Sequence, residues 1–258
     1  MREGVHPRAA VGFDRAAAAY QRGRAGYPQA AIEAILAATD AAPGRTLLEL
    51  GAGTGKLTSA LTGSGARVIA LEPVAGMREL LAQTAPAAEP LDAVAELIPL
   101  PDGSVDGVIA AQAFHWFEPV ATAAEIARVL APGGAVALIW NRRDERVAWV
   151  SELSRILDAE AGDTPRYKHS DWRRGFDANP AFQPLELLTW PHRGEPGRDV
   201  ILERVASVSF VATLDETARS LVLAEVAGLL ETHPETRGRD DVALPYVTEL
   251  FTTRKREP

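Results

Sequence analysis

The stretch TLLELGAGTG, residues 46–55, constrains the fold of this chain more than any other feature. Residues 46–50 are mostly leucine and β-branched side chains, which is typical of a short buried strand. Three glycines at alternate positions follow from Gly51, and a helical pattern resumes at Lys56. Glycines let a chain turn sharply and let a ligand approach the backbone. The stretch therefore predicts a strand, a glycine loop and a helix N-terminus whose free N–H groups suit a nucleotide-like ligand.

Two common glycine motifs do not fit this loop. A P-loop requires G-x-x-x-x-G-K-[ST], and Leu50 and Leu57 break that pattern at its two ends. The dinucleotide fingerprint G-x-G-x-x-G requires a glycine at the position of Lys56. The pattern that remains is E-L-G-A-G-T-G, for which an ordinary tight turn between a strand and a helix is the alternative interpretation.

An acidic residue ends the next predicted strand. Residues 67–71, RVIAL, predict that strand, and Glu72 follows it about 20 positions after the glycine loop. A carboxylate in this place can accept hydrogen bonds from both hydroxyls of a ribose. Sites for NAD and for S-adenosylmethionine share this device, so Glu72 favours an adenosine ligand without choosing between them. A solvent-exposed carboxylate at a helix start is the alternative.

A histidine among aromatic residues follows the fourth predicted strand. Residues 105–111 are apolar enough to be buried on both faces of a sheet, and QAFHWF follows at residues 112–117. Open α/β sheets bind ligands beyond the carboxyl ends of their strands. His115 is therefore a candidate general base or a group that orients an acceptor, and an imidazole that only forms part of the pocket wall is the alternative.

These motifs, taken in chain order, resemble a known family. The segments E-L-G-A-G-T-G, Glu72, IPLPDGSVD (residues 98–106) and Q-A-F-H-W-F-E resemble the class I S-adenosylmethionine (SAM) methyltransferases. They are most similar to the group of trans-aconitate methyltransferase-like and type 11 methyltransferases. Residues 13–28 also resemble the lead F-x(6)-Y-x(3)-R-x(2)-Y-P of one subset, so the resemblance covers most of residues 13–140.

The resemblance implies one methyltransferase domain over residues 1–258, with an α/β, Rossmann-like fold. Its expected core is a seven-stranded, mostly parallel sheet with helices on both faces and the last strand inserted antiparallel. The alternation of strands and helices through residue 140 also predicts a parallel sheet. We expect an N-terminal cap over about residues 13–40. We expect a substrate-side lid insertion over about residues 141–183, because large aromatic residues there are not typical of a linker.

The resemblance also implies SAM as the cofactor and S-adenosylhomocysteine as its product. The expected cofactor-binding residues come from the cap, the glycine loop and the ends of the predicted strands. They are Tyr20, Arg24, Glu49, Gly51, Ala52, Gly53, Glu72, Pro73, Met77, Ala95, Glu96, Ala111 and Gln112. The expected substrate-binding residues are His115, Trp116, Trp140 and Asn141. For the tryptophans, packing in the core is the alternative.

Methyl transfer from SAM depends mainly on positioning, and it needs a base only where the acceptor keeps its proton near neutral pH. We expect a SAM-dependent methyltransferase that acts on a small molecule, with oxygen as the favoured methylated atom and a carboxylate favoured by the trans-aconitate resemblance. Two alternatives stay open. One is a SAM-binding protein without methyl transfer, and the other is an NAD-dependent oxidoreductase, which Lys56 disfavours.

Composition narrows the partners and the location. The formal net charge of −8 over 258 residues argues against a general nucleic-acid or anionic-membrane binder. No apolar run approaches the ~20 residues of a membrane helix, and the N-terminus lacks the apolar core of a signal peptide. A cytoplasmic protein is expected. There are no cysteines and the histidines show no ligand spacing, so no metal site is expected. A monomer and a homodimer both stay open.

Overall fold

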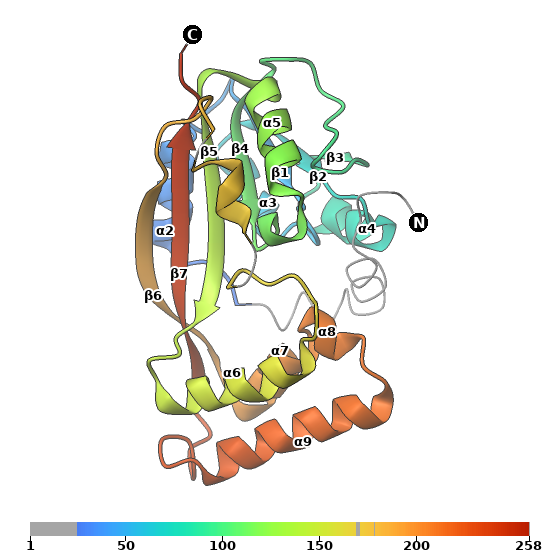
Figure 1. Cartoon of the computed structure of the whole chain (residues 1–258), viewed down its shortest axis with the longest axis vertical. Coiled ribbons are helices and arrows are strands. Elements are labelled where there is room, and N and C mark those ends of the chain that lie inside the picture. Colours follow the sequence, from blue (N-terminus) through green and yellow to red (C-terminus); the bar gives the residue numbers. More distant parts are fainter. Residues whose placement is uncertain (1–24, 169–170, 178, 258) are drawn as a thin grey trace.

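The computed structural model describes residues 25–168, 171–177 and 179–257. Its strands form one seven-stranded sheet in the order β3-β2-β1-β4-β5-β7-β6 (Figure 1). The pairs from β3 to β5 are parallel, whereas β7 runs antiparallel to both β5 and β6. This arrangement confirms the predicted α/β sheet, including its antiparallel last strand.

The strands predicted at residues 46–50, 67–71 and 105–111 have the same bounds in the structure. β3 ends at Leu91, because Val94 forms an isolated bridge with Leu97 instead of extending the strand. β5 and β6 are long strands, because both pair along most of the long β7. The strands are β1 (Thr46–Leu50), β2 (Arg67–Leu71), β3 (Glu89–Leu91), β4 (Val105–Ala111), β5 (Leu130–Arg143), β6 (Glu186–Pro196) and β7 (Ala243–Arg254).

Capping side chains and extended residues set the ends of several helices. α5 begins at Pro119, where the Glu118 carboxylate accepts a hydrogen bond of 2.6 Å from the Ala121 N–H. The chain from Arg198 to Ala212 forms two helices and not one, because Val208 has an extended backbone. The described α-helices are α2 (Gln29–Ala38), α3 (Thr58–Thr62), α4 (Ala75–Thr84), α5 (Pro119–Val129), α6 (Ala148–Glu160), α7 (Arg198–Ala206), α8 (Ser209–Ala212) and α9 (Glu216–Thr232).

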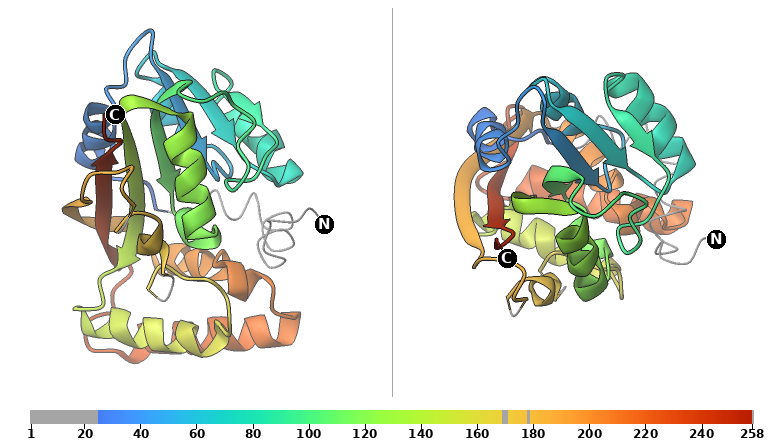
Figure 2. Two further views of the ribbon diagram at one scale, coloured as in Figure 1. Left: turned by 45° about the horizontal axis from the view of Figure 1, so that its top comes forward. Right: turned by 90° about the horizontal axis from the view of Figure 1, so that it is seen from above.

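Helices cover both faces of the sheet (Figure 2). Successive strand residues point to opposite faces, so neighbours in one strand enter different cores. Leu48 of β1 packs in the cluster that contains Ile126 of α5. Leu47 packs in the cluster that contains Ile35 of α2 and Leu61 of α3. Both faces are therefore buried, which explains the continuous apolar runs of the central strands.

A separate layer of helices lies beyond the carboxyl ends of the parallel strands (Figure 1). It consists of α6, α7, α8 and α9, which share one hydrophobic cluster. β7 supplies Leu244 and Tyr246 to that cluster, because β7 and β5 continue past the end of β4. The antiparallel strand thus connects the sheet to the helical layer.

The aromatic segment expected to form a lid packs mostly in the core instead. Trp172, Phe176 and Phe182 are buried in the same cluster as Phe114 and Trp140. Of the expected lid at residues 141–183, α6 belongs to the layer over the strand ends, together with α7–α9. The large aromatic residues after α6 thus reflect core packing. Within the part of the chain that the structure describes, no helix combines the length and apolarity needed to cross a bilayer.

Candidate active site

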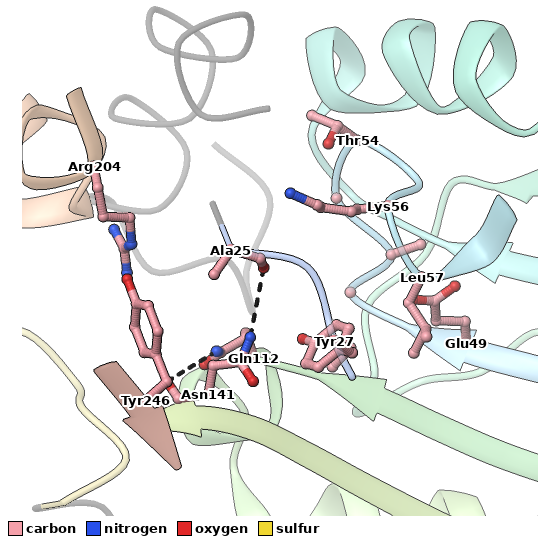
Figure 3. A pocket seen from close by; sticks show the side chains of 14 residues that line it. Ala25, Tyr27, Glu49, Thr54, Lys56, Leu57, Gln112, Asn141, Arg204 and Tyr246 are labelled. Atoms are coloured by element: carbon pink, nitrogen blue, oxygen red, sulfur yellow. Dashed lines mark hydrogen bonds between the residues drawn. The ribbon is translucent and has the colours of Figure 1, made fainter. Parts of the chain in front are cut away.

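A cavity lies at the carboxyl ends of β1 and β4, between the glycine loop and α7 (Figure 3). It encloses about 570 Å³, part of which is open to solvent. Several expected residues line it together, and these are Glu49, Gly51, Ala52, Gly53, Ala111, Gln112 and Asn141. The predicted glycine-loop site is therefore a cavity in the structure.

The glycine loop is shaped by two different constraints. Gly51 and Gly53 both have a left-handed backbone, with φ of +65° and +59°. A Cβ added to Gly51 would lie 2.8 Å from the Cβ of Ala113, so the segment after β4 requires a glycine there. A Cβ added to Gly53 would meet no atom within 4 Å. Packing therefore does not explain Gly53, whose backbone faces open space at the cavity.

Glu72 supports the loop that it was expected to complement. Its Oε2 accepts a hydrogen bond of 2.9 Å from the Gly53 N–H, and its Oε1 accepts one of 2.9 Å from the Val74 N–H. Burial raises the pKa of Glu72, and these two backbone bonds oppose that rise. The carboxylate thus joins the end of β2 to the loop after β1, while each oxygen keeps a further lone pair for a ligand.

Glu49 is a buried acid on the wall of the cavity. It is 1% exposed, and its Oε2 accepts a hydrogen bond of 2.6 Å from the Thr58 hydroxyl. Burial raises the pKa of Glu49 to about 8, the Thr58 hydrogen bond opposes the rise, and repulsion from Glu72 adds to it. A cationic ligand beside these two acids would favour their ionised forms.

Gln112 and Asn141 shape the opposite wall of the cavity. Gln112 has a φ of +56°, which is uncommon for a residue with a side chain, and it turns the chain at the end of β4. Its Nε2 donates to the Asn141 carbonyl at 3.2 Å. The Asn141 amide donates to the Gly26 carbonyl at 2.8 Å and accepts from the Thr248 hydroxyl at 2.7 Å. Asn141 therefore anchors the chain at residues 25–26 beside the cavity (Figure 3).

His115 and Trp140 form one unit at the end of β4. The Trp140 indole Nε1–H donates to His115 Nδ1 at 3.2 Å. Trp140 is 1% exposed and packs in the core against the tilted rings of Tyr167 and Trp172, so the expectation that it contacts substrate is wrong. It orients His115 instead. Trp116 lies beside His115 with ring centroids 5.4 Å apart and remains partly exposed.

Other expected cofactor residues lie near the loop rather than on the cavity wall. Ala95 and Met77 are buried, at 1% and 2% exposure, and Pro73 is partly exposed at the start of α4. Glu96 Oε1 accepts from the Glu118 N–H at 2.8 Å, and its Oε2 has no hydrogen-bond partner among the described residues. Tyr20 and Arg24 fall outside the described residues. Of the expected cap, α2 lies against the sheet and residues 25–28 lead to the cavity.

The wall also includes residues that were not expected to bind a ligand, among them Lys56, Arg204 and Tyr246. Arg204 and Tyr246 come from α7 and β7, far along the chain from the glycine loop. Nothing in their local sequence distinguishes them from ordinary helix and strand positions. Within the described ranges, no group of three potential metal ligands occurs.

The buried Glu49 carboxyl predicts a pH-dependent stability. The folded protein holds a proton on Glu49 up to about pH 8, whereas the unfolded chain releases it near the ordinary value of 4.5. The free energy of unfolding should therefore fall as the pH rises between these values. Glu49→Gln removes this titration. The free energy of unfolding of the variant, relative to that of the wild type, should therefore increase toward pH 8, on the order of a few kcal/mol.

Urea unfolding between about pH 5 and pH 8 measures this difference. Glu79→Gln, which removes an exposed carboxylate on α4, should follow the wild-type curve. Parallel pH profiles for Glu49→Gln and the wild type would contradict the assignment.

Comparisons with known proteins identify the family of this chain. Residues 48–138 match a family described as a methyltransferase domain. An uncharacterized methyltransferase of Mycobacterium tuberculosis is 40% identical over 238 residues, which cover 92% of this chain and 93% of that protein. The malonyl-[acyl-carrier protein] O-methyltransferase of Methylococcus capsulatus is 36% identical over 135 residues, which cover 49% of each chain.

A similar structure is also known. A protein of Anaeromyxobacter dehalogenans, assigned as a type II methyltransferase, matches with a TM-score of 0.67 and 26% identity, over 90% of this chain and 97% of that one. Because these relatives are methyltransferases and cover nearly the whole chain, the alternative of an NAD-dependent oxidoreductase is rejected. The glycine loop, the acid after β2 and the relatives over nearly the whole chain lead to one assignment. The chain belongs to the class I SAM-dependent methyltransferases, and SAM is its cofactor.

Proposed function

We propose that this methyltransferase methylates an oxygen atom of a small molecule bound in the cavity beside the glycine loop. The observation that carries the proposal is the position of that cavity. It lies between the glycine loop and the layer of α6–α9, with Gly53 on one wall and Tyr246 on another. A cavity covered in this way suits a small acceptor, and the O-methyltransferase of Methylococcus capsulatus supports oxygen as the acceptor atom.

The residues around the loop fit SAM. The open space over Gly53 leaves room for a ligand against the backbone, and Glu72 has lone pairs for ribose hydroxyls. Glu96 Oε2, which lacks a hydrogen-bond partner among the described residues, supports a role for Ala95 and Glu96 near the adenine amine. Pro73, Met77, Tyr20 and Arg24 stay as predicted cofactor contacts.

Gly53→Ala tests this placement of the cofactor. The added methyl group would enter the space that we assign to the ligand, so we expect the dissociation constant of S-adenosylhomocysteine to rise at least about tenfold, or ~1.4 kcal/mol. The left-handed backbone adds a stability cost of about 1–2 kcal/mol. Titration calorimetry measures the first effect and thermal unfolding the second.

Gly44→Ala is the matched control, since Gly44 also has a positive φ of +89°, has open space around its Cβ position and lies outside the cavity lining. It should lose stability and keep its affinity. Unchanged affinity in Gly53→Ala would remove Gly53 from the cofactor site.

The side chains of this protein contribute positioning to the reaction. When bound, SAM supplies a methyl group already activated by the sulfonium. An indole N–H only donates, so Nδ1 of His115 must accept from Trp140. In the neutral imidazole the proton then lies on Nε2, which can donate to an acceptor oxygen and cannot remove its proton. This geometry supports an orienting role for His115 over a general-base role.

His115→Ala separates these two roles by magnitude. Loss of one orienting hydrogen bond, about 0.5–1.5 kcal/mol, should lower kcat/KM roughly 2–13-fold. Loss of a general base costs about 10²–10⁴-fold. His115→Gln, whose amide can both accept from Trp140 and donate, should recover most of the activity. The affinity for S-adenosylhomocysteine should stay the same in both variants.

A profile of kcat/KM between about pH 5.5 and 8 provides the second readout. We expect its shape to be the same in the wild type and in His115→Gln. Loss of an ionisation from the profile of His115→Gln would assign the base role to His115 and overturn the orienting role.

The methylated atom is tested with an acceptor panel. The purified protein and SAM are incubated with carboxylic acids, phenols, amines and thiols of matched size, and S-adenosylhomocysteine is measured. We expect turnover with oxygen acceptors, and mass spectrometry with alkaline hydrolysis distinguishes esters from ethers. Methylation of nitrogen or sulfur alone would contradict the oxygen assignment, and turnover only with a macromolecule would contradict the small-molecule assignment.

A further inference from the structure

A second cavity adjoins the first on the side of α7. It encloses about 1180 Å³, part of which is open to solvent, and it lies between α7 and the strands β6 and β7. Both cavities are lined by Ala25, Lys56, Arg204 and Tyr246. These shared residues place the two cavities side by side.

The junction of the two cavities is positively charged. Figure 3 shows Arg204 reaching from α7 toward the hydroxyl end of Tyr246, and Lys56 extending from the other side of the same space. Among the described residues, the Arg204 guanidinium hydrogen-bonds to the Ser207 hydroxyl at 3.3 Å and forms no ion pair with a carboxylate. The acids of the second cavity, Glu195 and Glu203, are exposed and form no ion pair with Arg204 within the described chain.

A second arginine, Arg143, lies close enough to Arg204 to repel it. The Arg143 Nε donates to the Ser154 hydroxyl at 2.9 Å. Burial lowers the pKa of Arg143, and repulsion from Arg204 lowers it further. An anion beside Arg204 would reduce this repulsion. A guanidinium also binds carboxylate and phosphate groups with two parallel hydrogen bonds.

The rest of the second cavity includes an apolar wall. Val200 and Ile201 of α7 face it, together with Leu244 and Tyr246 of β7. Ile201, Leu244 and Tyr246 are buried parts of the hydrophobic cluster of the helical layer, so this wall is fixed by packing. A ligand that suits this cavity therefore combines an anionic group with an apolar body.

We propose that the second cavity binds the acceptor through an anionic group, a carboxylate or a phosphate, held by Arg204 at the junction. Lys56 adds positive charge there, and the apolar part of the acceptor lies against Val200, Ile201 and Leu244. The anionic group is a handle that is not methylated, and the reacting oxygen extends into the first cavity. This inference rests on the proposed function, because it assigns the substrate class of the same site.

The test uses three probes with the same apolar chain. Octanoate, octyl phosphate and octanol are titrated by calorimetry into the full-length protein saturated with S-adenosylhomocysteine. We expect at least one of the two anions to bind at least tenfold more tightly than octanol. A preference between octanoate and octyl phosphate identifies which oxyanion the junction favours. Equal binding of the anions and octanol, or no binding of the anions, would overturn the inference.

Arg204→Gln should remove the preference for the anions and leave the affinity for octanol within about twofold. Arg155→Gln removes the same charge from an exposed position of α6 outside both cavities, and it should keep the preference. An unchanged preference in Arg204→Gln would overturn the role of Arg204. If Arg204→Gln does not fold, Arg204→Lys keeps the charge without the fork, and it should bind the anions more weakly than the wild type does.

Binding of S-adenosylhomocysteine, measured first in each titration, separates the two proposals. If it binds and the anions do not, only the acceptor subsite fails. The acceptor panel with SAM then still tests the methylated atom independently.

Discussion

The hydrogen bond between the Gly53 N–H and the Glu72 carboxylate is the contact on which the site depends. It joins the loop after β1 to the end of β2, and the same carboxylate also holds the Val74 N–H at the start of α4. On the other side of the loop, Gly51 lies too close to Ala113 for any side chain. The loop is thus held from two neighbouring strands, and its left-handed backbone at Gly53 is maintained before any ligand arrives.

Two buried acids make this support electrically unusual. Glu49 lies in β1 and Glu72 directly follows the neighbouring strand β2. Burial raises the pKa of both carboxyls, and repulsion from Glu72 raises the pKa of Glu49 further. A cationic group bound beside these acids would offset that cost, because a nearby cation favours a carboxylate. On the proposed placement of SAM, binding of the cofactor would therefore be coupled to ionisation of these acids.

Local spacing made part of this site predictable. The strand, the glycines and Glu72 lie within one stretch of chain, so their pattern alone indicated an adenosine site. The prediction for Trp140 was wrong, because a tryptophan at a strand end has the same local sequence whether it faces a cavity or the core. Its position in the core depends on packing against Tyr167 and Trp172, which are distant in the sequence. Arg204 and Tyr246 gave no signal, since they reach the cavity through tertiary packing of α7 and β7.

The long pairing of β5 with β7 has a consequence for how this enzyme can change. Residues 48–138, which match the methyltransferase domain, include the glycine loop and Glu72, whereas of the lining of the second cavity they include Lys56 alone. The two parts of the chain meet through one ladder, in which Arg143 pairs with Tyr246. Exchange of residues 186–254 between relatives, with that ladder kept in register, is therefore a route to chimeric enzymes that retain the cofactor and accept new substrates.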